Sequence, residues 1–66
     1  MSVTAAYHLW TGNPGESARV TLVEFSSVEE AKSAPMPDNL VAAFIFVDHG
    51  YYHRGKTTGW DFTDYS

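Results

Sequence analysis

In two segments near the start of the chain, successive side chains would form distinct sets on the two faces of an extended strand. The segments run from Val3 to Trp10 and from Ala18 to Phe25. A period of two residues indicates a β-strand, and β-branched residues favour one in the second segment. Residues 11–15 between them, Thr-Gly-Asn-Pro-Gly, are dense in turn formers. We therefore predict an antiparallel hairpin in which the second strand presents Val20 and Leu22 on one face and Arg19, Thr21, Val23 and Phe25 on the other.

A short helix is predicted to follow the hairpin. Ser26 and Ser27 each precede a glutamate by three positions, which is the capping-box pattern. Pro35 biases the residue before it away from helical geometry, so the helix should end near Ala34. So short a helix is unstable alone and must pack on a sheet through a narrow apolar stripe, formed by Val28, Ala31 and Ala34.

The segment from Leu40 to Val47 is apolar at every position. Such a run fits either a strand buried on both faces or a buried helix. The aromatic and β-branched residues at its end favour a strand, whereas Asn39 as a cap would permit a helix start. We predict a strand and keep the helix as the alternative.

The chain is then predicted to turn back. Asp48-His49-Gly50 is typical of a tight turn with Gly50 at positive φ, and Tyr51 to Arg54 is expected to form the returning strand. Residues 55–59 form a second loop. The segment from Trp60 to Tyr65 alternates aromatic with polar residues, so it either adds a short edge strand or docks as a tail.

These elements predict one domain spanning residues 1–66, of class α+β. Its architecture is a small four-stranded antiparallel sheet, β-β-α-β-β, with one short helix on one face. A single short helix cannot cover four strands, and Leu40 to Val47 is apolar on both sides. The second face must therefore be covered by the C-terminal aromatic segment, a second copy of the chain or a partner protein.

The length of 66 residues limits the core, because a domain of this size buries only about 60% of the surface of its unfolded chain. The absence of cysteine rules out disulfides and thiolate metal sites as additional supports. Aromatic residues, at 15% of the chain, provide one remaining support, and association of copies provides the other. We therefore expect a homo-oligomer, most simply a dimer.

The charge balance argues against several partners. The formal net charge is −4, and the four fixed positive charges are scattered, which disfavours binding of nucleic acid through its phosphates. The acidic residues are too few and too dispersed for mimicry of DNA. No stretch has the length of a membrane span, and the N-terminus lacks the pattern of a signal peptide. We expect a soluble cytoplasmic protein with no membrane or nucleic-acid partner.

Candidate chemistry is sparse. His49 and His53, with Asp48 and His8, are the nearest approach to a set of metal ligands. In a strand, however, His49 and His53 would stand about 13 Å apart, so we predict neither a metal site nor another cofactor. No serine has a setting that suggests a nucleophile, and residues 12–17 lack the lysine and the helix of a phosphate-binding loop. We predict that the chain is not an enzyme.

Aromatic residues concentrate toward the C-terminus, with seven of the ten at or beyond Phe44. Such rings dominate protein-binding surfaces, although in so small a chain they also serve as core. Tyr51 and Tyr52 cannot both point inward from one strand. The predicted binding surface consists of Tyr51, Tyr52, Arg54, Trp60, Phe62 and Tyr65.

The main functional hypothesis is a small acidic protein-interaction module without enzymatic activity, which associates with itself or binds a protein partner. An inhibitor or adaptor, for example one encoded by a phage or another mobile element, is compatible with this size and charge. The hypothesis predicts that Trp60→Ala or Tyr52→Ala abolishes association and leaves the fold intact. The alternative is a small-ligand binding protein, with a nucleotide or aromatic metabolite held at a subunit interface.

Overall fold

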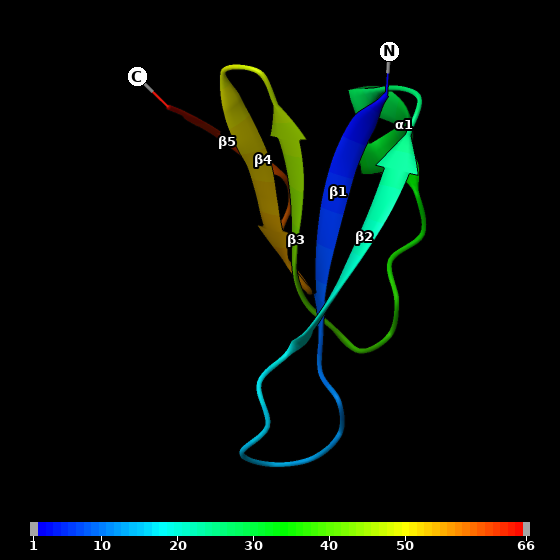
Figure 1. Cartoon of the computed structure of the whole chain (residues 1–66), viewed down its shortest axis with the longest axis vertical. Helices are drawn as coiled ribbons and strands as arrows, with labels where there is room; N and C mark the ends of the chain where they lie inside the picture. Colours follow the sequence, from blue (N-terminus) through cyan, green and yellow to red (C-terminus); the bar gives the residue numbers. More distant parts are fainter. Residues whose placement is uncertain (1, 66) are drawn as a thin grey trace.

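A computed structural model describes residues 2–65 of the chain. In chain order the elements are β1 (Val3–Leu9), β2 (Arg19–Phe25), α1 (Val28–Ser33), β3 (Leu40–Val47), β4 (Gly50–Gly55) and β5 (Asp61–Asp64). All neighbouring strands are antiparallel, and the sheet has the order β2-β1-β3-β4-β5 (Figure 1). The predicted antiparallel sheet with one short helix is confirmed. The sheet has five strands rather than four, because residues 61–64 pair with β4 at the edge.

Helix α1 begins where the serine and glutamate pattern placed it. Ser27 is the N-cap, and its hydroxyl oxygen accepts a hydrogen bond from the backbone N–H of Glu30 at 3.1 Å. The Glu30 carboxylate returns to the preceding serine, accepting from the Ser26 hydroxyl at 2.7 Å. The helix ends at Ser33, two residues before Pro35. Within residues 2–65, no helix combines the length and apolar character needed to traverse a lipid bilayer.

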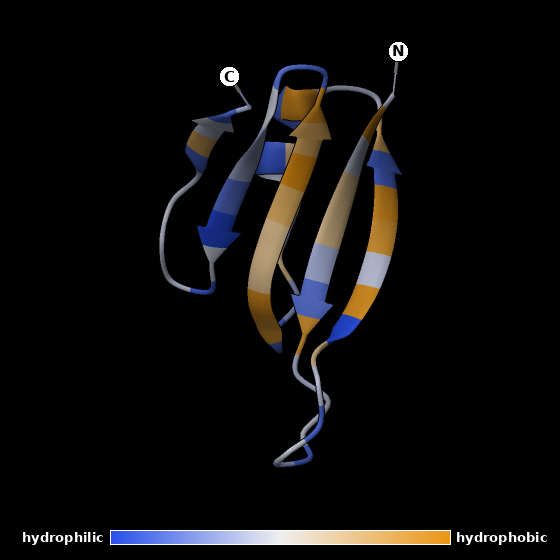
Figure 2. Cartoon of the chain, turned by 60° about the vertical axis from the view of Figure 1, so that its left-hand side comes forward, coloured by the Kyte–Doolittle hydropathy of each residue, from blue (hydrophilic) through white to orange (hydrophobic). Residues whose placement is uncertain are grey.

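One face of the sheet carries the core. Helix α1 lies on this face against β1 and β2, behind the sheet in the view of Figure 2. Ala31 of the helix is buried in one cluster with Ala5 on β1 and Ile45 on β3, and these two strand residues pair with each other in the sheet. The core is small, because its fully buried members are mostly alanines. The buried cluster consists of Ala5, Tyr7, Ala31, Leu40, Ala43 and Ile45.

The turn between β3 and β4 differs from the prediction. Asp48 and His49 form the turn, and Gly50 already belongs to β4. Among residues 2–65, positive φ occurs only at Gly12 and Gly15, so Gly50 is not held by backbone conformation. A Cβ atom at Gly50 would collide with the backbone of β5 and lie 2.6 Å from Cζ of Phe62. Glycine is needed there because β5 packs closely over it.

Candidate functional site

The second face of the sheet is open. None of the elements within residues 2–65 covers it, and β5 extends the sheet sideways instead of folding over it (Figure 2). Leu22 is 67% exposed and Val20 is 53% exposed, both on β2. Phe46 on β3 is 42% exposed. Several large apolar side chains exposed on one face are characteristic of an interaction surface.

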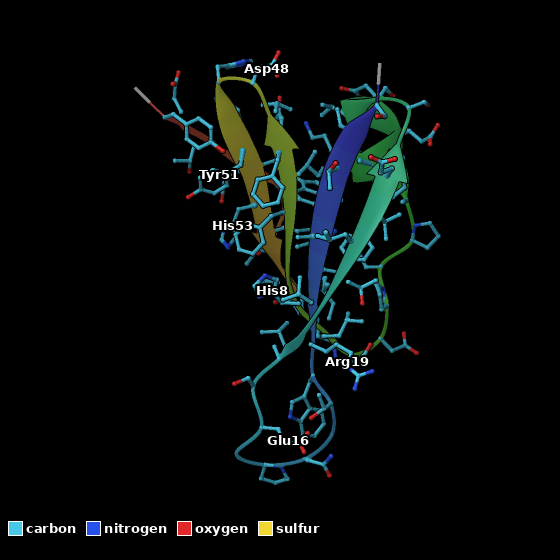
Figure 3. All side chains as sticks on the ribbon, in the orientation of Figure 1. His8, Glu16, Arg19, Asp48, Tyr51 and His53 are labelled. Carbon is cyan, nitrogen blue, oxygen red and sulfur yellow. The ribbon has the colours of Figure 1, made fainter. Side chains whose placement is uncertain are left out.

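Phe44 lies at the centre of this open face. Its ring centroid is 5.1 Å from that of His8 on β1 and 5.2 Å from that of His53 on β4. The rings of Tyr51 and Phe46 lie 6.1 Å and 6.3 Å away. The side chains of His8, His53 and Tyr51 project from the same side of the sheet in Figure 3. Aromatic rings at these separations attract one another, so the cluster is ordered before any partner binds.

The six residues predicted as a binding surface divide between the two faces. Tyr51 and Tyr65 contact each other at the open face, with ring centroids 6.0 Å apart. The other four belong to the helix side. The ring centroids of Tyr52 and Phe62 are 4.9 Å apart. Cζ of the Arg54 guanidinium lies 5.7 Å from the centroid of the Trp60 ring. Lys32 of α1 adds a cation–π contact, 4.6 Å from the Tyr52 ring centroid.

Sequence reasoning missed most of the open face. The predicted surface omitted the residues that β1, β2 and β3 place there, which are His8, Val20, Leu22, Phe44 and Phe46. A signal was present, because β2 is apolar on both sides and Leu40 to Val47 has no polar position. That signal shows that a second apolar face exists. It does not show which strands lie beside one another on it.

The three histidines do not converge. His49 lies in the turn after β3, with its ring 5.5 Å from that of Phe62. His53 and His8 lie on opposite sides of Phe44. No group of three or more metal-ligating side chains is found within residues 2–65. In that part of the chain each imidazole contacts an aromatic ring.

The loop between β1 and β2 forms an open hollow of about 570 Å³, lined in part by Trp10, Arg19 and Asn39. The Glu16 carboxylate occupies its rim and accepts hydrogen bonds from the Thr11 hydroxyl at 2.8 Å and from Nδ2 of Asn13 at 3.3 Å (Figure 3). A carboxylate in this position repels phosphate. The hollow therefore lacks the character of a phosphate site.

Charge is confined to the outer strands of the open face. Within the described strands, the register places two charged residues on this face, which are Glu24 on β2 and Asp61 on β5. Arg54 faces the helix side instead, as does Lys32. The centre of the open face is therefore apolar and aromatic, and its periphery is acidic.

Comparison of the chain with protein-family models, curated proteins and solved structures found no match. The function is therefore argued from the geometry of the open face.

Proposed function

We propose that this protein is a non-enzymatic protein-interaction module whose docking surface is the open face of the sheet. One observation carries the proposal: Leu22, Val20 and Phe46 are exposed together on a face that no other element covers. Leaving such a surface in water is unfavourable by about 25 cal/mol per Å² of apolar area, and docking recovers that free energy. An inhibitor or adaptor would use the same surface to occupy a face of another protein.

The aromatic cluster supports docking rather than catalysis. Tyr and Phe rings that are already packed against neighbours lose little conformational entropy on binding. Phe44 and Tyr51 meet this condition, because each contacts further rings. The cluster combines these rings with the imidazoles of His8 and His53.

The small-ligand alternative has weaker support. A ligand stacked among Tyr51, Tyr52 and Trp60 would need these rings on one face, but Tyr51 lies on the open face and the other two lie on the helix side. The hollow on the open face measures about 240 Å³, less than the roughly 300 Å³ at which ligand pockets begin. Its lining, His8, Phe44, Phe46 and Tyr51, has no cationic residue to meet an anionic group.

Substitution on the open face tests the proposal. Leu22→Glu places a charge in the docking surface, and Trp10→Ser removes a comparably exposed apolar side chain from the loop as the matched control. Association is measured by sedimentation velocity from about 5 µM to about 500 µM, a range that covers weak to moderate affinity. Binding to proteins of a cell lysate is measured in parallel.

The expected result is a complex formed by the native chain and by Trp10→Ser but lost in Leu22→Glu. Circular dichroism should show that all three proteins remain folded, because Leu22 contributes little to the core. A native chain that forms no complex with itself or with another protein overturns the proposal. So does a complex that Leu22→Glu leaves unchanged.

A further inference from the structure

The register of the strands arranges the open face into three rows that run across the sheet. From β2 to β5, the first row is Glu24, Thr4, Phe46, Tyr51 and Thr63. The middle row is Leu22, Ala6, Phe44, His53 and Asp61. The last row is Val20, His8, Ala42 and Gly55.

Side-chain size changes from one end of the strands to the other. On β3, Phe46 occupies the first row and Ala42 the last. On β4, Tyr51 occupies the first row and Gly55 the last. Strands β3 and β4 therefore carry large side chains in the first row and small residues in the last. Strand β1 does the reverse, with Thr4 in the first row and His8 in the last.

We propose that the partner of the open face is a second copy of this chain, packed face to face about a two-fold axis that crosses the strands along the middle row. The proposal rests on the proposed function and names its partner. Such an axis places the first row of each copy over the last row of the other. Phe46 then meets Ala42 of the second copy, and His8 meets Thr4 of the second copy, so that a large side chain faces a small one in each case.

The competing two-fold axis, parallel to the strands, fits poorly. It would set Phe46 against Phe46 of the second copy, large against large. The crosswise axis instead sets Phe46 against Ala42 of the second copy, and Leu22 against Leu22 of the second copy. Side-chain size thus favours the crosswise axis over the axis parallel to the strands.

The available area is sufficient for a weak dimer. Five strands about 4.8 Å apart, with on average about six residues of 3.4 Å each, give a footprint of roughly 500 Å². Burying it on both copies removes roughly 1,000 Å² from water, which is the size of a weak interface and below the roughly 1,200 Å² at which stable specific interfaces begin. The product is an aligned β-sandwich with a helix on each outer surface.

The centre of the face favours an apolar partner. The acidic residues of the face, Glu24 and Asp61, lie on its two edge strands, β2 and β5, and its centre carries no fixed charge. The crosswise axis places Glu24 over Val20 of the second copy near the rim. His53 pairs with Asp61 across the strands, so an imidazole lies beside the place where the two Asp61 carboxylates approach.

Single cysteines test the arrangement, since the native chain contains none. Leu22→Cys and His53→Cys each lie on the middle row, on different strands, and each should be joined to its own copy by a short bis-maleimide. Thr21→Cys, on the helix side of β2, is the matched control and should remain unlinked. Each variant is first checked by sedimentation to confirm that it associates as the native chain does.

The pattern of products decides between arrangements. Cross-linking of both Leu22→Cys and His53→Cys supports the crosswise dimer. Cross-linking of Leu22→Cys alone indicates pairing through the free edge of β2 and overturns the proposal, as does cross-linking of neither. A native chain that stays monomeric but binds another protein through Leu22 also overturns it, while leaving the proposed function intact.

Discussion

Tyr51 and Tyr52 are adjacent in the chain but belong to different surfaces of the protein. The Tyr51 ring contacts Phe44 and Tyr65 on the open face, whereas the Tyr52 ring contacts Phe62 and Lys32 on the helix side. The alternation of side chains along a strand imposes this separation. The pair therefore provides a matched comparison between packing and docking within one dipeptide.

The position of Tyr52 on the helix side changes the expectation drawn from the sequence, which was that Tyr52→Ala abolishes association. We now expect Tyr52→Ala to destabilise the fold and Tyr51→Ala to weaken association. Tyr52 packs against the core, so its removal should lower the free energy of unfolding by about 2 kcal/mol. Tyr51→Ala should change it by less than about 1 kcal/mol, since Tyr51 lies outside that cluster. Urea unfolding at low protein concentration measures both. Equal loss of stability in the two variants would contradict the division of the sheet into a packed and a docking face.

Gly50 should tolerate no side chain. Gly50→Ala brings a methyl group against β5 and Phe62, and we expect it to lower stability by about 1–3 kcal/mol. Gly59→Ala is the control, because a Cβ there meets nothing within 4 Å. Thermal unfolding measures the change, and amide hydrogen exchange should show that protection is lost first in residues 61–64. An unaltered β5 in Gly50→Ala would show that the strand lies farther from β4 than described.

The cap of α1 should contribute measurably. Ser27→Ala removes the acceptor for the Glu30 amide, and we expect a loss of about 1 kcal/mol. Ser33→Ala, at the other end of the helix, makes the same chemical change at an exposed position and should be nearly neutral. Chemical unfolding of both variants makes the comparison. If the two changes were equal, the cap would not be what fixes the start of the helix.

Tyr7 should make the fold sensitive to alkali. Burial raises the pKa of the Tyr7 hydroxyl above its ordinary value of 10.0, because desolvation disfavours the phenolate. The folded state thus binds this proton more tightly than the unfolded state does. The contribution to stability is complete below pH 10.0 and is lost as the pH rises through the folded pKa.

Tyr7→Phe tests both consequences of that burial. The Tyr7 hydroxyl is buried and has no hydrogen-bond partner among residues 2–65, so its removal should raise stability near neutral pH by about 1 kcal/mol. Stability measured from about pH 8 to about pH 11 should then fall less steeply in Tyr7→Phe than in the native chain. Parallel curves would mean that the hydroxyl is hydrated in the folded protein.

Association should strengthen as salt is added. Each copy carries a net charge of −4, so two copies repel each other at low ionic strength. Raising salt from about 0.02 M to about 0.2 M shortens the Debye length to below about 10 Å and should lower the dissociation constant several-fold. Sedimentation equilibrium measures it. Weakening with salt would instead indicate attraction between opposite charges at the interface.

The elements were predictable because their signals are local. Alternation identifies β1 and β2, the serine and glutamate spacing identifies the start of α1, and Pro35 limits its end. Each of these features depends on residues that are close together in the chain, so a short stretch of sequence is enough to predict it. The requirement for Gly50 was predicted for the wrong reason, because its cause is Phe62 and the backbone of β5, which are distant in sequence.

The candidate site was only partly predictable. The sequence predicts that Tyr51 and Tyr65 belong to a binding surface, and both lie on the open face. It does not predict this of Phe44, because an apolar run does not show which of its residues will meet the helix. That choice depends on which face of the sheet α1 packs against. Helix α1 packs against the face of β1 and β2 that carries Ala5 and Val23.

By itself the sequence determined that this protein is a small antiparallel sheet with one helix, and that a second apolar face exists. Tertiary structure alone decided the strand order β2-β1-β3-β4-β5 and the pairing of β5 at the edge. It also gathered His8, Phe44 and His53, from three strands, into one cluster. The physical reason is that strand pairing is set by the best burial of the whole chain, and local patterns specify which faces are apolar but not which strands lie side by side.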